Sequence, residues 1–216
     1  MASDAFADSA SFRDPSGHVY RIDGRILRTV TELAASDFEA VRASGIYEEL
    51  VASGKVIAAD ILEQGVPEPL AQGARFVLEH PRLPFISYPY EWSFAELKAA
   101  ALLHLDVHLT AVDRGITLSD ASAYNVQFIG ARPIFIDTLS FRPYREGEYW
   151  TGHRQFCEQF LNPLLLRAMF GTPHNEWYRG ALEGIATADL ARLLPLHRKL
   201  SWNVLSQVVL PATFER

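Results

Sequence analysis

Three polar side chains, Asp120, Asn125 and Asp137, have residue types and spacing that suit metal-assisted chemistry. Carboxylate and amide oxygens are hard ligands for Mg²⁺, which takes a few protein oxygens and completes its shell with water and substrate phosphates. We therefore predict Asn125 and Asp137 to be metal ligands. A further carboxylate, that of Asp120, can orient or deprotonate an acceptor hydroxyl. The alternative is structural, because Asx-rich turns and strand-end aspartates often cap backbone groups.

The elements around these residues predict that they converge. The predicted hairpin has strands Val126–Ile129 and Ile134–Ile136 and turns at Gly130–Pro133. In such a ladder Val126 lies opposite Asp137, so Asn125 falls within one residue of Asp137 at the same end. A slip of one residue changes the face that each side chain takes. Even so, the three polar groups should lie within several ångströms of one another.

A long helix is predicted upstream of this loop. Ser93 and Glu96 form a capping box, and Gly115 supplies a stop. At about 1.5 Å per residue the helix is roughly 30 Å long. His104 and His108 lie four residues apart on it, which is metal-ligand spacing, but satisfied helix histidines are commoner than zinc sites. Apolar residues at helical spacing should face the core: Leu97, Ala101, Leu105, Leu109 and Val112.

The N-terminal part of the chain is predicted to be β-rich. Turn sequences at Asp14–Gly17 and Asp23–Gly24 separate short strands, because proline presets φ and glycine supplies positive φ. A helix should begin at Ser36, with Glu39 at capping-box spacing, and Gly45 should divide it. The expected segments are strands Phe12–Arg13, His18–Ile22 and Arg25–Val30, a helix over Ser36–Ala52, two strand-like runs Lys55–Leu62 and Ala74–Leu78, and then the aromatic-rich stretch Phe85–Trp92.

The C-terminal part is predicted to be mainly helical, with a helix over His153–Phe170 bent at Pro163 and another over Ala186–Leu194. We therefore predict an α+β fold in two lobes. The predicted divisions are a disordered lead-in (1–10), a small β-rich N-lobe (11–92) and a mainly helical C-lobe (93–216) that carries the hairpin.

The D-x4-N loop after a long helix, followed by a hairpin and a second Asp, resembles the protein kinase and aminoglycoside phosphotransferase superfamily. The resemblance implies a protein-kinase-like two-lobed fold that binds ATP and Mg²⁺ and transfers phosphate to a small-molecule hydroxyl. It makes Asp120 the catalytic residue and Asn125 and Asp137 the metal ligands. The further cofactor-binding candidates are Arg28 in place of the usual phosphate-binding lysine, its partner Glu39, and Tyr90 and Trp92 in the adenine-binding hinge. Packing between lobes is an equal alternative for the aromatic residues.

Departures from that superfamily favour a second hypothesis, a non-catalytic, pseudokinase-like module. Leu118–Ser119 stands where the superfamily has a His before the catalytic Asp, and Thr138–Leu139 replaces the usual Phe-Gly after Asp137. The strand Arg25–Val30 contains no lysine, and arginine does not reproduce the geometry of lysine. The turn Asp14–Gly17 is the one positional candidate for a glycine-rich phosphate loop.

A second resemblance covers most of the chain. Its motifs are Phe85–Ser93, Asp120–Asn125, Pro133–Phe141 and Arg154–Cys157. They resemble a bacterial family of nodulation-protein-related, S-adenosylmethionine-dependent methyltransferases, in the region that precedes the methyltransferase domain. The chain contains no Gly-x-Gly, the usual cofactor turn of a Rossmann-like methyltransferase. S-adenosylmethionine is therefore expected only if a downstream domain exists. The non-catalytic module would bind substrate or dock against that domain, whereas the first hypothesis is a transferase.

Composition disfavours several other classes of protein. Of the 216 residues 49% are hydrophobic and 21% charged, which is ordinary globular composition. A formal charge of −6 disfavours nucleic-acid binding, and no apolar run approaches the roughly 20 residues of a membrane span. The single cysteine, Cys157, is predicted to be a buried thiol in a reducing compartment. Because the N-terminus has no signal-peptide pattern, the protein is predicted to be cytoplasmic.

Overall fold

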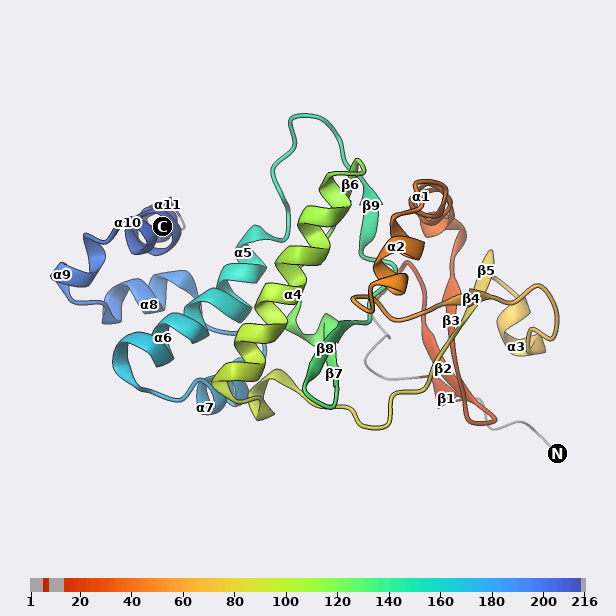
Figure 1. Cartoon of the computed structure of the whole chain (residues 1–216), viewed down its shortest axis with the longest axis horizontal. Helices are drawn as coiled ribbons and strands as arrows, with labels where there is room; N and C mark the ends of the chain where they lie inside the picture. The colour runs from red at the N-terminus through yellow and green to blue at the C-terminus, as the bar shows by residue number, and fades with distance from the viewer. Residues whose placement is uncertain (1–5, 8–13, 215–216) are drawn as a thin grey trace. The chain divides into compact units, whose positions relative to one another are not determined.

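The computed structural model describes residues 6–7 and 14–214, which form a mixed α/β protein (Figure 1). The chain divides into two compact units, each assembled from separate segments. Unit 1 consists of Met1–Phe85, Asp106–Ser119 and Ile134–Tyr149, and unit 2 consists of Ile86–Leu105, Asp120–Pro133 and Trp150–Arg216. The lobe boundaries expected from the sequence stay a prediction.

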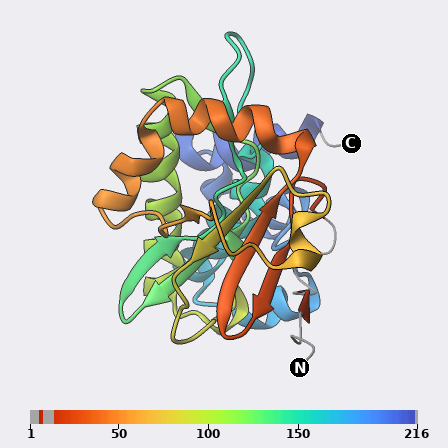
Figure 2. The ribbon, with the colours of Figure 1, turned by 90° about the vertical axis from the view of Figure 1, so that its right-hand side faces the viewer.

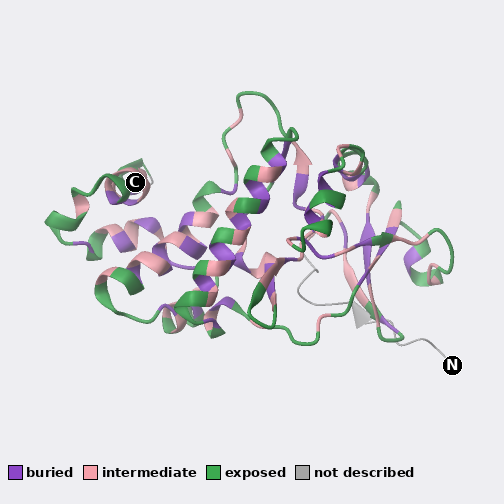
Figure 3. Cartoon of the chain, in the orientation of Figure 1, coloured by how far each residue is buried: buried purple, intermediate pink, exposed green. Residues whose placement is uncertain are grey.

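Unit 1 contains an antiparallel sheet with the strand order β1-β2-β3-β5-β4. Its strands are β1 (Phe6–Ala7), β2 (Val19–Ile22), β3 (Arg25–Val30), β5 (Phe76–His80) and β4 (Asp60–Ile61). Most residues of β3 and β5 are buried (Figure 3). Two further strands, β6 (Ile116–Leu118) and β9 (Phe141–Pro143), pair antiparallel in the same unit.

The predicted hairpin between β2 and β3 is confirmed. Ile22 pairs with Arg25, so only Asp23 and Gly24 form the turn. Both turn residues have positive φ, 49° for Asp23 and 80° for Gly24, as a tight hairpin that matches strand twist requires. The strand expected at Phe12–Arg13 lies outside the described residues.

Helices α1 (Glu32–Ala43) and α2 (Ile46–Ala52) follow β3. Helix α1 runs across the end of the sheet at which β3 finishes (Figure 2). The predicted start at Ser36 is wrong, because α1 begins four residues earlier, directly after Thr31. The predicted division at Gly45 is confirmed, and this glycine has φ of 72°. Its positive φ explains why a glycine stands there.

One of the two strand-like runs differs from prediction. The run Lys55–Leu62 contains only the two-residue strand β4 and a bridge from Val56 to Phe135. The aromatic-rich stretch Phe85–Trp92 contains a 3₁₀ turn, η2 (Pro89–Glu91). Pro89 fits a turn better than a strand, because it has no N–H to donate to a strand ladder. Between β4 and β5 lies the short helix α3 (Glu68–Ala71).

The long helix α4 (Phe94–Val112) confirms the predicted element and its capping box. Ser93 N donates to Glu96 Oε2 at 2.7 Å, and Glu96 N donates to Ser93 Oγ at 3.3 Å. The predicted apolar stripe is wrong toward the C-terminus, where Leu109 is 62% exposed. Steps of four residues turn 400°, so such a stripe drifts about 40° per step around the helix. The buried residues follow the true period: Leu97, Ala100, Ala101, His104, Val107, His108 and Ala111.

Unit 2 contains a helical run through α5 (His153–Phe156), a π segment η4 (Cys157–Leu161) and α6 (Asn162–Phe170). A helix bent at Pro163 was predicted here. The helix is present, and the π segment η4 ends two residues before Pro163. Because Pro163 has no N–H, the carbonyl of Gln159 is free to accept the hydroxyl of Tyr178. The neighbouring Glu158 carbonyl accepts the N–H of Ile185 at 2.8 Å.

The rest of unit 2 packs short helices around one apolar cluster. The helices are α7 (Asn175–Gly180), α8 (Thr187–Leu193), α9 (Leu196–Lys199), α10 (Trp202–Val204), the π segment η5 (Leu205–Val209) and α11 (Leu210–Phe214). Helix α8 confirms the helix expected near 186–194. The cluster comprises Leu166, Ile185, Leu190, Leu194, Val204 and Val208. Among the helices of the described chain, none combines the length and apolarity that crossing a bilayer requires.

The close approach of Gly17 to β3 gives a stability prediction. A Cβ at position 17 would lie 1.8 Å from the Thr29 carbonyl oxygen, so the turn or the strand would have to move. We expect Gly17→Ala to lower the free energy of unfolding by about 2–4 kcal/mol, measured by urea denaturation. Gly180→Ala is the matched control, because nothing lies within 4 Å of its added Cβ. Equal stability of the two variants would contradict the tight contact.

Candidate functional site

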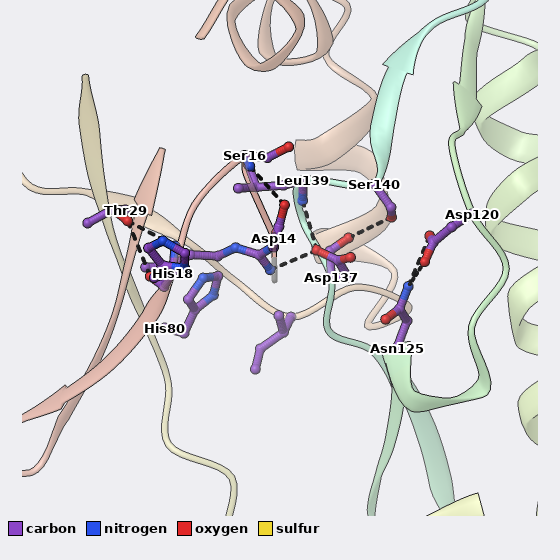
Figure 4. Close-up of polar contacts among 12 residues, drawn as sticks. Asp14, Ser16, His18, Thr29, His80, Asp120, Asn125, Asp137, Leu139 and Ser140 are labelled. Atoms are coloured by element: carbon purple, nitrogen blue, oxygen red, sulfur yellow. Dashed lines mark hydrogen bonds and ion pairs between the residues drawn. The ribbon is translucent and has the colours of Figure 1, made fainter. Parts of the chain in front are cut away.

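The candidate site in unit 1 is organised around the guanidinium of Arg28, which lies between two carboxylates. These belong to Asp14 and Asp137, both labelled in Figure 4. Arg28 Nη1 donates to Asp137 Oδ1 at 2.7 Å, and Nη2 donates to Asp14 Oδ2 at 2.8 Å. The Arg28 side chain is only 9% exposed. A buried guanidinium is tolerable only when charged partners replace its water, so the two carboxylates account for its burial.

Strand β3 fixes the position of Arg28. Its backbone pairs with Val19 on one side and Leu78 on the other, in the interior of the sheet. The side chain therefore extends from a backbone that has little freedom to move. Arg28 Nε is also buried and has no hydrogen-bond partner among the described residues. Among the described residues, the guanidinium therefore has hydrogen-bond partners at Nη1 and Nη2 but not at Nε.

Asp137 lies in a tight turn beyond strand β8 (Arg132–Phe135). Its Oδ1 also accepts the N–H of Leu139 at 3.1 Å, and its carbonyl accepts Ser140 Oγ at 3.1 Å. The segment before the turn is anchored in unit 1, because Phe135 N donates to the Lys55 carbonyl at 2.9 Å. The other carboxylate oxygen, Oδ2, has no hydrogen bond that the described residues supply.

The predicted hairpin is confirmed in its first strand, β7 (Val126–Ile129), and wrong in its turn. The turn is Gly130–Ala131, and the second strand already begins at Arg132. Gly130 has φ of 61°, which a two-residue turn can use. Asp137 consequently lies two residues past the end of β8 and not in the ladder opposite Val126.

Asp14 belongs to the turn that precedes β2. Its Oδ1 accepts the N–H of Ser16 at 2.9 Å, while its Oδ2 contacts Arg28. The same turn is bonded to the end of β3 through Thr31, whose N–H donates to the Ser16 carbonyl at 2.9 Å. This is the turn that the sequence offered as a positional substitute for a phosphate loop.

His80 on β5 is a neutral neighbour of this charged cluster. Its Nδ1 lies 2.9 Å from the Ala58 carbonyl, so the neutral ring donates from Nδ1. Burial lowers the pKa of His80 below 6.5, and the charge on Arg28 lowers the pKa further. The Ala58 hydrogen bond and the carboxylates of Asp137 and Asp60 raise the pKa, but to a smaller extent than burial lowers it.

Glu39 is not the partner of Arg28 that the sequence suggested. Its carboxylate lies 3.9 Å from Arg75, and both side chains are more than half exposed. The terminal nitrogens of Arg28 instead donate to the carboxylates of Asp14 and Asp137. Ion pairs of this exposure contribute little to stability.

A cavity of about 270 Å³ adjoins both carboxylate turns of unit 1. Ser16, two residues after Asp14, and Thr138, next to Asp137, both line it. Its other walls combine polar and apolar side chains: Leu33, Ala34, Asp37, Phe38, Ser119, Leu139, Phe141 and Arg142.

Asp120 and Asn125 lie together in unit 2. Asn125 Nδ2 donates to both carboxylate oxygens of Asp120, each at 3.1 Å (Figure 4). The short turn η3 (Ala123–Asn125) places them on the same side of the loop. Asp137 belongs to unit 1, so the predicted convergence of all three residues stays a prediction.

Two glutamines that the sequence analysis did not select hold the loop of Asp120. Gln155 Oε1 accepts the N–H of Ala121 at 2.9 Å, and Gln159 Oε1 accepts the N–H of Ala123 at 2.7 Å. Residues four apart on a helix share one face, which explains how both amides reach the loop. The available signal was Gln155 itself, which lies within the Arg154–Cys157 motif.

The aromatic candidates have different surroundings. Trp92 is only 2% exposed, and its Nε1 donates to Ser87 Oγ at 2.9 Å, so it is a core residue. Tyr90 stacks on Tyr88 with ring centroids 5.4 Å apart, and Tyr88 is 43% exposed. Asn175 Nδ2 donates to the carbonyls of Tyr90 and Trp92, at 3.0 Å each.

The other metal and thiol candidates lie in packed surroundings. Cys157 is buried, as predicted. The fully buried His104 stacks against Trp150 and Phe156, with ring centroids 5.9 Å away in each case. Within residues 6–7 and 14–214, no three His, Cys, Asp or Glu side chains gather as a metal-binding group.

Comparison with known proteins identifies one relative. The chain is 48% identical over 207 residues to Nodulation protein NoeA of Rhizobium meliloti (strain 1021). The match covers 96% of this chain and 43% of that protein, so the chain spans less than half the length of its relative. No protein-family model matches the chain. The likeness supports the bacterial, nodulation-protein-related family that the motifs resemble.

The lowered pKa of His80 predicts a pH effect on stability. Because the folded-state pKa lies below the unfolded value of about 6.5, protonation favours the unfolded chain, and stability falls as pH drops below that value. We expect His80→Gln to lose less stability than the parent protein between about pH 7 and pH 5, with a difference of at most about 1.4 kcal/mol per pH unit. Urea titrations at each pH measure this, and other histidines cancel in the comparison. Parallel pH profiles would contradict the assignment.

The glutamine contacts predict a local effect on the Asp120 loop. Gln159→Leu leaves the buried Ala123 N–H without its acceptor, at a cost of about 1–3 kcal/mol. We expect faster amide hydrogen exchange at Ala123, by tenfold or more, with little change in β3 of unit 1. Gln64→Leu, at an exposed position, is the control. Unchanged exchange at Ala123 would show that Gln159 does not hold the loop.

Proposed function

We propose that this chain is a kinase-like module that binds a nucleotide through its phosphates, with Arg28 as a phosphate ligand and Asp137 as a magnesium ligand. One observation carries the proposal: the Arg28–Asp137 ion pair at 2.7 Å joins residues 109 positions apart in the chain. The family resemblance assigns both residues to the phosphate end of one nucleotide, and ligands of the same phosphate chain must lie a few ångströms apart. The ion pair brings the two side chains within that distance, which supports the proposal.

The chemistry of the donor set supports the same proposal. Asp137 Oδ2 has no hydrogen bond among the described residues and is a hard oxygen of the kind that Mg²⁺ prefers. The guanidinium of Arg28 is the side-chain group best suited to two phosphate oxygens at once. With the carboxylates of Asp14 and Asp137, the three side chains sum to a charge of −1, which favours a cation beside them. When bound, magnesium would neutralise phosphate charge.

Asp120 and Asn125 extend the proposal from binding to phosphate transfer. The resemblance assigns Asp120 to a small-molecule hydroxyl and Asn125 to the metal. Asn125 Nδ2 donates to both oxygens of Asp120, and each carboxylate oxygen has more than one lone pair, so Asp120 is proposed to accept the proton of an acceptor hydroxyl as well. The two glutamine contacts to the loop support this role, because a catalytic carboxylate needs a fixed backbone.

A second candidate function is a non-catalytic module that binds substrate or docks against a methyltransferase domain. The observation that favours it is the coverage of the relative, more than half of which lies outside the match. The doubly paired state of Arg28 also fits a structural role, because both terminal nitrogens are already used. S-adenosylmethionine would then bind the other domain, and this chain would show no nucleotide affinity.

Calorimetric titration with ATP and Mg²⁺ tests the first candidate. We expect binding to the full chain that weakens at least tenfold in Asp137→Asn and also when EDTA removes the magnesium, because both changes remove a metal bridge to the phosphates. Asp113→Asn is the control, as an exposed acid that makes no ion pair among the described residues. A parent protein that binds neither ATP–Mg²⁺ nor ADP–Mg²⁺ at millimolar concentration would overturn the proposal and favour the docking module.

A further inference from the structure

We infer that Arg28 Nη2 and the backbone N–H of Ser16 together form a binding site for one phosphate group. Without a ligand, both donors bond to the carboxylate of Asp14, which a phosphate must displace. This rests on the proposed nucleotide binding. It adds the atoms that receive a phosphate, and it makes Asp14 an internal competitor of the ligand.

The geometry of the Asp14 carboxylate is that of a bound anion. Its Oδ2 lies 2.8 Å from Arg28 Nη2, and its Oδ1 lies 2.9 Å from the backbone nitrogen of Ser16. Each oxygen thus takes one donor, and the two donors come from different segments of unit 1. Carboxylates and phosphates share this two-oxygen mode of recognition, so a phosphate can use the same pair of donors.

Both donors are held by contacts that do not involve Asp14. Arg28 extends from the centre of the sheet and keeps its bond to Asp137. The Ser16 turn is bonded to Thr31, whose Oγ1 also donates to the Pro15 carbonyl at 2.9 Å. Gly17 lies against the carbonyl of Thr29, where no side chain would fit. Departure of the Asp14 side chain would therefore leave a preorganised pair of N–H donors.

Asp14 is the exchangeable member of the cluster. Its side chain is 32% exposed, against 21% for Asp137 and 9% for Arg28. A partly exposed carboxylate regains water when it leaves an ion pair, so Asp14 loses less on leaving Arg28 than the more buried Asp137 would. Ser16 also lines the cavity of about 270 Å³.

Charge explains why Asp14 opposes ligand binding. With both carboxylates in place the three side chains carry a net −1, and a phosphate that approaches Arg28 meets this excess. When Asp14 is neutral, Arg28 and Asp137 balance, and the competing carboxylate is absent. We therefore expect tighter phosphate binding when a neutral residue of similar shape replaces Asp14.

The experiment is a calorimetric titration of the full chain with ATP–Mg²⁺ and, separately, with inorganic tripolyphosphate and Mg²⁺. We expect Asp14→Asn to bind both ligands about tenfold more tightly than the parent protein. Asp113→Asn, with the same change in net charge at a distant exposed position, should bind like the parent protein. Should Asp14→Asn fail to fold by circular dichroism, Asp14→Ser removes the charge and keeps an oxygen for the Ser16 N–H.

The outcomes separate this inference from the proposed function. Tighter binding by the Asp14 variant alone supports the inference. If the parent protein does not bind at millimolar concentration and the Asp14 variant does, nucleotide binding by the parent protein falls, while a phosphate site that Asp14 fills is supported. Equal or weaker binding by the Asp14 variant, with a parent protein that does bind, overturns the inference and leaves nucleotide binding standing. If neither protein binds either ligand, both proposals fall.

Discussion

Unit 1 depends on the burial of one guanidinium. Arg28 stands on a central strand with its side chain 9% exposed, and removing such a group from water is costly unless charged partners surround it. The partners come from positions 14 and 137, so this single requirement ties a turn near the N-terminus, a sheet strand and a turn beyond β8 into one cluster. The neutral form of His80, favoured by burial beside them, avoids a second cation in the same place.

The same constraint limits what the cluster can do. A purely structural ion pair is best served by one carboxylate and one guanidinium, which cancel. Here a second carboxylate adds negative charge, Arg28 Nε stays buried without a hydrogen bond among the described residues, and Asp137 Oδ2 has none either. A cluster that has a net charge and polar atoms without hydrogen bonds is less stable than a neutral, fully bonded one. Such clusters are typical of ligand-binding sites, where the ligand supplies the missing charge and hydrogen bonds.

Local signals in the sequence predicted local structure well. The Asp23–Gly24 hairpin, the division at Gly45 and the Ser93–Glu96 cap each depend on residues within four positions, and each is confirmed. The sequence could nominate Arg28, Asp120, Asn125 and Asp137 through family motifs, but not their partners. The link between Arg28 and Asp14 depends on how a turn folds over a strand, and the support of the Asp120 loop comes from glutamines more than 30 positions away. Long-range pairing leaves no periodic mark in a single sequence.

We expect this chain to bind the phosphate end of a nucleotide more strongly than its base. In the region proposed as the hinge, Trp92 is buried, and the carbonyls of Tyr90 and Trp92 already accept hydrogen bonds from Asn175, so these groups offer little to a base. The donors around Arg28, by contrast, hold two carboxylates, of which that of Asp14 is the more exposed. Binding energy would then come chiefly from phosphates and magnesium, with weak discrimination between bases. This asymmetry favours the nucleotide-binding proposal over the docking module, because a docking surface needs shape complementarity, whereas an anion site needs aligned donors beside a buried cation.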